Sequence, residues 1–143
     1  MRFFKRDKKG ISSDTEKKRK VWGINREALN LILEVSKESY PKEFIATLIA
    51  KKGIIEEINL LPGTLSGNRM AIIHTHMQPP DITLSVVGIV HSHPSRDFRP
   101  SGADLHFFSK FGNTHIIVGM PYNIDSWQAY DVYGNLIDLK VVD

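Results

Sequence analysis

The chain has 143 residues, of which 41% are hydrophobic and 24% are charged, so it is long enough to bury a hydrophobic core as one domain. It contains no cysteine, which excludes disulfide bonds and a catalytic thiol. No apolar run is long enough to span a membrane or to form the core of an export signal, so we expect a cytoplasmic protein.

Positive charge is concentrated at the start of the chain. Residues 1–20 contain nine Lys or Arg and three Asp or Glu, a net charge of +6, whereas the whole chain carries +3 and residues 21–143 therefore carry −3. We predict a basic N-terminal extension over 1–20 and a folded domain over 21–143, with no nucleic-acid binding by the domain. The extension is either a solvated tail or an arm for an acidic partner, RNA or a second copy of the chain, which leaves a homo-oligomer possible.

The first half of the domain reads as a helix followed by a hairpin. Asn25 is a suitable N-cap for a helix that runs to about Tyr40, where Pro41 stops it. Apolar or mixed runs over 44–50 and 54–61 predict two strands joined by a tight turn. A Gly- and Ser-rich loop over 62–68 follows.

The second half reads as a strand, a helix and three further strands. An apolar run over 84–90 predicts a buried strand that continues through His93, and a helix is expected from Ser101 to about Phe111. A strand over 115–119 comes next, and a hairpin that turns at Gly134-Asn135 is expected to join strands over 127–133 and 136–142.

The segment from His91 to Asp104, which we call the metal motif, holds three good zinc ligands. If the strand continues through His93, alternation directs His91 and His93 to the same face. Asp104 falls in the first turn of the following helix. Two imidazoles and one carboxylate predict one catalytic Zn²⁺ per chain, with a water as the fourth ligand. Such a site also requires a general base, for which a further carboxylate is expected.

The order His-Ser-His, seven residues, Ser, two residues, Asp resembles the signature of the JAMM (JAB1/MPN/Mov34, MPN+) metalloproteases. The resemblance extends over about residues 22–143 and includes Ser39–Phe44, which is similar to the family's upstream segment with the catalytic glutamate. It implies an α/β domain with a curved, mixed, MPN-like sheet flanked by helices.

The resemblance also implies roles for single residues. Glu43 is the general base, Ser101 helps to stabilise the tetrahedral oxyanion, and His91, His93 and Asp104 bind zinc. The family cleaves isopeptide bonds to ubiquitin and ubiquitin-like modifiers, so the expected partners are such modifiers and their conjugates. Two other activities fit the same motif: release of an amino acid or peptide from a ubiquitin-like sulfur-carrier protein, and a non-catalytic binding or scaffold module.

Several residues have a second interpretation. Ser101 is also a suitable N-cap, with Asp104 as its partner in a capping box. Glu43 has rivals for the role of base that spacing alone does not eliminate, namely Glu34, Glu38, Glu56 and Glu57. The remaining histidines, His106 and His115, are expected to be structural.

A second His-x-His pair, His74 and His76, also follows an apolar run. No Ser and Asp follow it at the distances found in the metal motif, so lining of a substrate groove is a better prediction for it than metal binding. The neighbouring loops over 62–69 and 76–83 are expected to hold the extended C-terminal tail of a modifier by strand addition. Because the second loop is short, we expect a broad preference among substrates.

Overall fold

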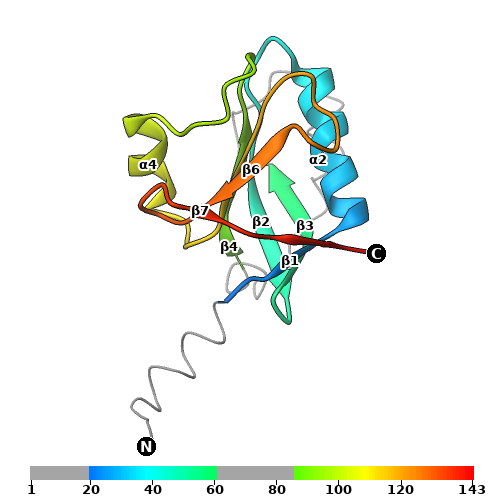
Figure 1. The fold of residues 1–143 in the computed structure, drawn as a ribbon, viewed down its shortest axis with the longest axis vertical. Helices are drawn as coiled ribbons and strands as arrows, with labels where there is room; N and C mark the ends of the chain where they lie inside the picture. The colour runs from blue at the N-terminus through cyan, green and yellow to red at the C-terminus, as the bar shows by residue number, and fades with distance from the viewer. Residues whose placement is uncertain (1–19, 61–85) are drawn as a thin grey trace, which may run out of the picture.

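The computed structural model describes residues 20–60 and 86–143. The elements run in the order β1 (Gly23–Asn25), α2 (Arg26–Ser39), β2 (Ile45–Lys51), β3 (Ile54–Leu60), β4 (Val86–Ser92), α4 (Gly102–Phe108), β5 (His115–Val118), β6 (Trp127–Tyr130), β7 (Leu136–Ile137) and β8 (Lys140–Val142) (Figure 1). The basic extension, the His74/His76 pair and both predicted substrate loops lie outside the described residues. Within the described ranges, no helix is long and apolar enough to cross a membrane.

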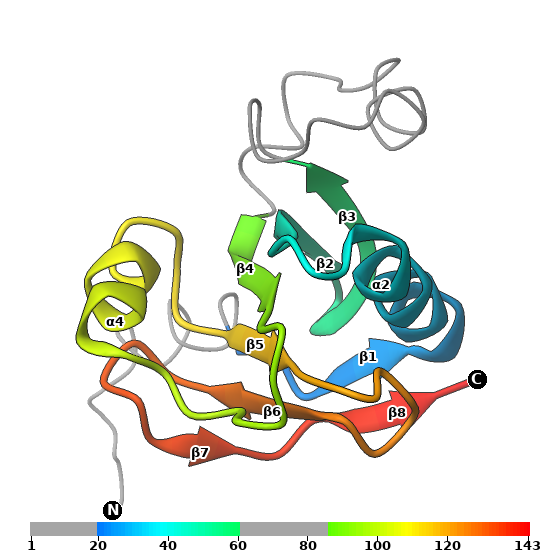
Figure 2. The same ribbon diagram turned by 90° about the horizontal axis from the view of Figure 1, so that it is seen from above.

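The strands form a single mixed sheet in the order β7-β6-β5-β4-β2-β3-β1-β8. The pairs β4–β5, β1–β3 and β1–β8 are parallel, and the remaining pairs are antiparallel. The two edge strands, β7 and β8, are separated by only two residues in the chain, so the sheet is strongly curled (Figure 2). The expected fold class, an α/β domain with a curved mixed sheet flanked by helices, is confirmed.

The two helices lie on opposite faces of the sheet (Figure 2). Helix α2 packs its apolar face on one side of the sheet, in a core cluster that includes Val90 and Ile116. Helix α4 covers the other face with Phe108, which packs in a cluster with Ile89 and Ile117. Because β4 and β5 are covered on both faces, their sequences are nearly continuous apolar runs, as parallel strand pairs in a sheet interior require.

The N-terminal helix and the first hairpin agree with the predictions. The Asn25 side chain accepts hydrogen bonds from the backbone N–H groups of Glu27 and Ala28, and the helix ends at Ser39. The β2–β3 turn places Lys52 and Gly53 at φ angles of 54° and 82°. Two successive positive φ angles are typical of the tight turns whose twist matches that of a hairpin.

The helix of the metal motif is shorter than predicted. It ends at Phe108 rather than about Phe111, and the chain turns so that the N–H groups of Asn113 and Thr114 both donate to the carbonyl of Val87. These tertiary hydrogen bonds lead the chain into β5 and leave no room for a further helical turn.

The predicted C-terminal hairpin is wrong in its second half. Strand β6 ends at Tyr130, and it pairs only with Leu136 and Ile137 of the expected strand over 136–142. The chain then crosses to the other edge of the sheet, where Lys140–Val142 pairs with β1. Strand β1 has only three residues, too few to show a strand periodicity in the sequence. The sequence therefore did not predict that β1 would offer a second edge with which the end of the chain could pair.

Candidate metal centre and catalytic pocket

The predicted zinc ligands converge in space although they come from two elements. His91 is near the end of β4, His93 directly follows the strand, and Asp104 is in the first turn of α4. The two Nε2 atoms of the histidines lie 3.0 Å apart. The Asp104 Oδ1 is 3.2 Å from His91 Nε2, and its Oδ2 is 3.4 Å from His93 Nε2. Each residue therefore directs one donor atom at a common point.

These three distances fit a bound zinc ion. A tetrahedral ion with bonds of about 2.0–2.2 Å holds its ligand atoms about 3.3 Å apart. Two imidazoles and one carboxylate are also a ligand set found in catalytic zinc sites. Within the described residues, His91, His93 and Asp104 are the group of three such side chains close enough to share one ion. His91, His93 and Asp104 are thus the residues that can hold the metal.

Asp104 is held as an anion. Burial raises the pKa of its carboxyl, but the hydrogen bond to His91 and the backbone N–H of Ser101 oppose this effect and together bring the pKa well below its usual range. A carboxylate that stays ionised provides the negative charge that a divalent cation requires.

The orientation of His93 is fixed from outside the donor cluster. Its Nδ1 lies 2.7 Å from the carbonyl oxygen of Asp97. Because a carbonyl only accepts hydrogen bonds, Nδ1 carries the proton and Nε2 keeps its lone pair for a metal. The Tyr122 hydroxyl donates to the His93 carbonyl at 2.9 Å and holds the backbone at the same point.

His91 is the more deeply buried ligand. Its side chain is 3% exposed, and among the described residues its Nδ1 has no hydrogen-bond partner. The ring lies beside His93 and Phe108, with centroids 4.8 and 6.2 Å away. Packing, rather than a second hydrogen bond, therefore holds this ring within the described part of the protein.

Ser101 forms the capping box that its sequence allowed. Its Oγ accepts from the backbone N–H of Asp104 at 3.0 Å, and Asp104 Oδ2 accepts from the backbone N–H of Ser101 at 2.8 Å. The same carboxylate thus caps α4 and faces both histidines, so the start of the helix fixes the third ligand. The catalytic role of Ser101 stays a prediction.

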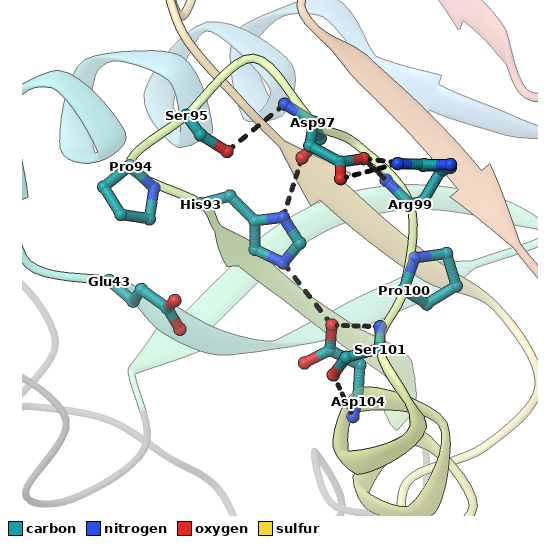
Figure 3. A pocket seen from close by; sticks show the side chains of 9 residues that line it. All are labelled: Glu43, His93, Pro94, Ser95, Asp97, Arg99, Pro100, Ser101 and Asp104. Atoms are coloured by element: carbon teal, nitrogen blue, oxygen red, sulfur yellow. Dashed lines mark hydrogen bonds and ion pairs between the residues drawn. The ribbon is translucent and has the colours of Figure 1, made fainter.

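Glu43 lines the same pocket as the ligands. This open pocket has a volume of about 520 Å³ and is lined by Glu43, His93, Pro94, Ser95, Asp97, Arg99, Pro100, Ser101 and Asp104. Figure 3 shows Glu43 across from His93, on the segment between α2 and β2. The four rival glutamates are on α2 or β3 and do not line it. The tertiary structure therefore separates Glu43 from its rivals, which spacing could not do.

An ion pair on the pocket rim was not predicted. Arg99 donates from Nε and Nη2 to the two carboxylate oxygens of Asp97, at 3.0 and 3.1 Å, and its backbone N–H adds a third bond. The side-chain hydrogen bond from Arg99 lowers the pKa of Asp97 to about 2. Asp97 thus fixes His93 through its carbonyl and Arg99 through its carboxylate (Figure 3). The close Asp-x-Arg spacing is the signal that the sequence offered for this pair.

The two other histidines of the described ranges, His106 and His115, do not join the centre. His106 is exposed on α4. His115 is fully buried, stacks on Phe108 with ring centroids 4.2 Å apart, and accepts a hydrogen bond at Nδ1 from the backbone N–H of Ile89. Its Nε2 lies 2.9 Å from the carbonyl of Gly112. His115 therefore serves as a core linker between β4 and β5, in agreement with the structural role expected for it.

Comparison with known proteins gives a consistent assignment. Residues 25–130 match the model of the prokaryotic homologues of the JAB domain. A protein of Haloferax volcanii described as "Probable metalloprotease" is 36% identical over 135 residues, which cover 87% of this chain and 82% of that protein.

Two solved structures share both sequence and fold with this chain. A JAB1/MPN domain protein from Archaeoglobus fulgidus, AF2198, is 39% identical with a TM-score of 0.69, over 85% of this chain and 99% of that one. A structure described as "JAMM: A Metalloprotease-like Zinc Site in the Proteasome and Signalosome" is 37% identical with the same TM-score, over 86% and 99%. The chain has the fold of these proteins and belongs to the family of prokaryotic homologues of the JAB domain.

Proposed function

We propose that this protein is a zinc-dependent protease that hydrolyses isopeptide bonds between ubiquitin-like modifiers and lysine side chains. The observation that carries the proposal is the convergence of His91, His93 and Asp104 in a pocket that Glu43 also lines. Membership of a family with metalloprotease relatives supports the hydrolytic chemistry. The modifier as substrate follows from the resemblance of the metal motif to the JAMM signature.

Each residue has a defined part in this reaction. A zinc ion held by the three ligands would supply a Lewis acid for the scissile carbonyl and for the attacking water. Glu43 takes a proton from that water and later gives it to the leaving amine. Ser101 donates its hydroxyl to the oxyanion that develops on the carbonyl.

The first test compares Glu43→Gln with the wild type on a modifier joined to a lysine side chain. We expect Glu43→Gln to bind zinc as the wild type does, because no ligand changes, and to lose about a hundredfold or more in kcat, because an amide cannot accept the proton. The matched control is Glu56→Gln, an exposed glutamate on β3 away from the pocket, which should keep wild-type kcat. Normal turnover by Glu43→Gln would refute the assignment of the base.

The same preparation tests the metal and the substrate class. One equivalent of zinc per chain, loss of cleavage with a chelator and recovery with added zinc are expected. A protein that binds no zinc and cleaves nothing is a binding module instead. Cleavage confined to an amino acid or short peptide attached to a ubiquitin-like sulfur carrier would replace the isopeptidase proposal by the carrier-processing activity.

A further inference from the structure

Ser92 lies between the two metal-binding histidines but points away from the metal. Its side chain is on the opposite face of the strand from His91 and His93, and the residue is 1% exposed. Ser92 makes two hydrogen bonds with Phe44, the residue directly before β2. The Ser92 N–H donates to the Phe44 carbonyl, and the Ser92 Oγ accepts from the Phe44 N–H, both at 2.9 Å.

One of these bonds replaces a main-chain bond of the sheet. The antiparallel register pairs Ile45 with His91, so Phe44 and Ser92 are the next pair. Such a pair in a regular ladder exchanges two bonds between backbone groups. Here the Ser92 hydroxyl accepts the hydrogen bond that the Ser92 carbonyl would otherwise accept. The N–H of the next residue, His93, points to the opposite side, as backbone alternation requires, and donates to the carbonyl of Val118 in β5 at 2.7 Å.

The bond therefore holds the segment that precedes β2 against the end of β4. The register between β2 and β4 ends at the pair of Ile45 and His91, and the Ser92 hydroxyl extends the contact by one residue, to Phe44. Glu43 immediately precedes Phe44, and within the described part of the chain its carboxylate makes no hydrogen bond, so its place depends on the backbone that carries it. The Phe44 ring is fully buried in the core on the α2 face and anchors that backbone from the other side.

We infer that Ser92 is a positioning residue that holds Glu43 at the pocket through the Phe44 backbone, an inference that rests on the proposed role of Glu43 as general base. A base transfers a proton only within about 2.6–3.2 Å of its partner, and a displacement of about 1 Å can cost about a hundredfold in rate. Loss of the Ser92 hydroxyl, which accepts from Phe44 48 positions away in the chain, is thus expected to lower kcat.

The test uses Ser92→Ala, which removes the acceptor, and Ser92→Thr, which keeps it. For Ser92→Ala we expect kcat to fall about tenfold to a hundredfold, with zinc content unchanged and KM altered by less than about threefold. Ser92→Thr should restore kcat to within about threefold of wild type. The matched control is Ser36→Ala, which removes another fully buried serine hydroxyl, bonded to the Ile32 carbonyl within α2, and should leave kcat unaltered.

Combination with Glu43→Gln identifies the route of the effect. Once the base is absent, Ser92→Ala should lower the residual kcat by less than about threefold, because effects that pass through one group are not additive. An equal loss in both backgrounds, or loss of zinc together with activity, would overturn the inference. Wild-type kcat in Ser92→Ala would overturn it as well.

Amide hydrogen exchange at Phe44 gives a readout that needs no substrate. The Phe44 N–H should be protected in the wild type and Ser92→Thr, and should exchange much faster in Ser92→Ala. Equal protection in all three overturns the inference even if the enzyme is active. If the wild type cleaves nothing, the proposed function fails, while the exchange data still decide whether Ser92 holds this backbone. Ser92→Cys, with a weaker acceptor of similar size, takes the place of Ser92→Ala if that variant does not fold.

Discussion

At the scale of single residues, the metal motif depends on side chains that serve two purposes. The Asp104 carboxylate both receives the N–H of Ser101 and faces the two histidines. Asp97 fixes the tautomer of His93 and pairs with Arg99. Such sharing means that a substitution at one position changes both local stability and the geometry of the donors. Experiments on this site must therefore measure stability and turnover separately.

Ser101 allows these two effects to be separated. Ser101→Ala should lower the free energy of unfolding by about 1 kcal/mol, whereas Ser101→Gly should cost only a few tenths, because glycine is tolerated at an N-cap. Both variants lack the hydroxyl, so both should lose turnover if it donates to the oxyanion. Urea unfolding followed by tryptophan fluorescence, and kcat on a modifier conjugate, provide the two measurements. Full turnover by Ser101→Gly would reduce Ser101 to a helix cap.

At the scale of elements, the position of β4 depends on a close approach of backbone to backbone. A Cβ placed on Gly88 would lie 1.5 Å from the carbonyl oxygen of Thr114. This contact occurs where the chain enters β5, the strand that pairs with β4 from Val90 to Ser92 and so includes His91. The glycine in the middle of an apolar run is thus a requirement of tertiary packing rather than of local conformation.

Gly88→Ala should be strongly destabilising. Main-chain atoms of Thr114 cannot move without breaking the hydrogen bonds to Val87, so we expect a loss of about 3 kcal/mol or more. Gly102→Ala is the matched control, because no atom lies within 4 Å of a Cβ added there, and it should change stability by less than about 0.5 kcal/mol. Thermal or urea unfolding of the zinc-free proteins decides. A Gly88→Ala protein as stable as Gly102→Ala would contradict this packing.

At the scale of the whole molecule, a curled sheet brings distant parts of the chain to one pocket. Glu43 precedes β2, the histidines are at the end of β4 and Asp104 begins α4, and β2 and β4 are neighbours in the sheet. Outside the metal motif, the buried residues of the described ranges include one histidine, His115, and two tyrosines, Tyr122 and Tyr130, whose pKa values burial raises further. Protonation of His115 is therefore linked to global stability.

Stability of the zinc-free protein should fall as the pH drops below about 6.5. Burial lowers the pKa of His115 from 6.5 to about 4, so between these values the unfolded chain binds a proton that the folded protein does not. The loss is absent above pH 6.5 and reaches about 3 kcal/mol near pH 4. His115→Asn, which keeps an acceptor for Ile89 but does not titrate, should show a shallower decline in urea unfolding at each pH. Parallel curves for the two proteins would rule out His115 as the cause.

Much of this protein was determined by local sequence alone. Asn25 and Pro41 delimit α2, and the run before His91 predicts a buried strand, because caps, proline and side-chain periodicity act over a few residues. Alternation along that strand also placed both histidines on one face, and the capping box placed Asp104 in the first helical turn. The donor cluster could therefore be predicted from a stretch of fourteen residues.

Only the tertiary structure decided the remaining features. It selected Glu43 from five glutamates, because neighbouring strands, not sequence spacing, determine which carboxylate lines the pocket. It also divided the strand expected over 136–142, since β1 offered a competing edge across the curled sheet. The hydroxyl of Ser92 accepts from the backbone N–H of Phe44, 48 positions away in the chain, so its role could not be predicted from local sequence. Short-range preferences thus define the three candidate metal ligands, while long-range strand pairing brings Glu43 to the same pocket.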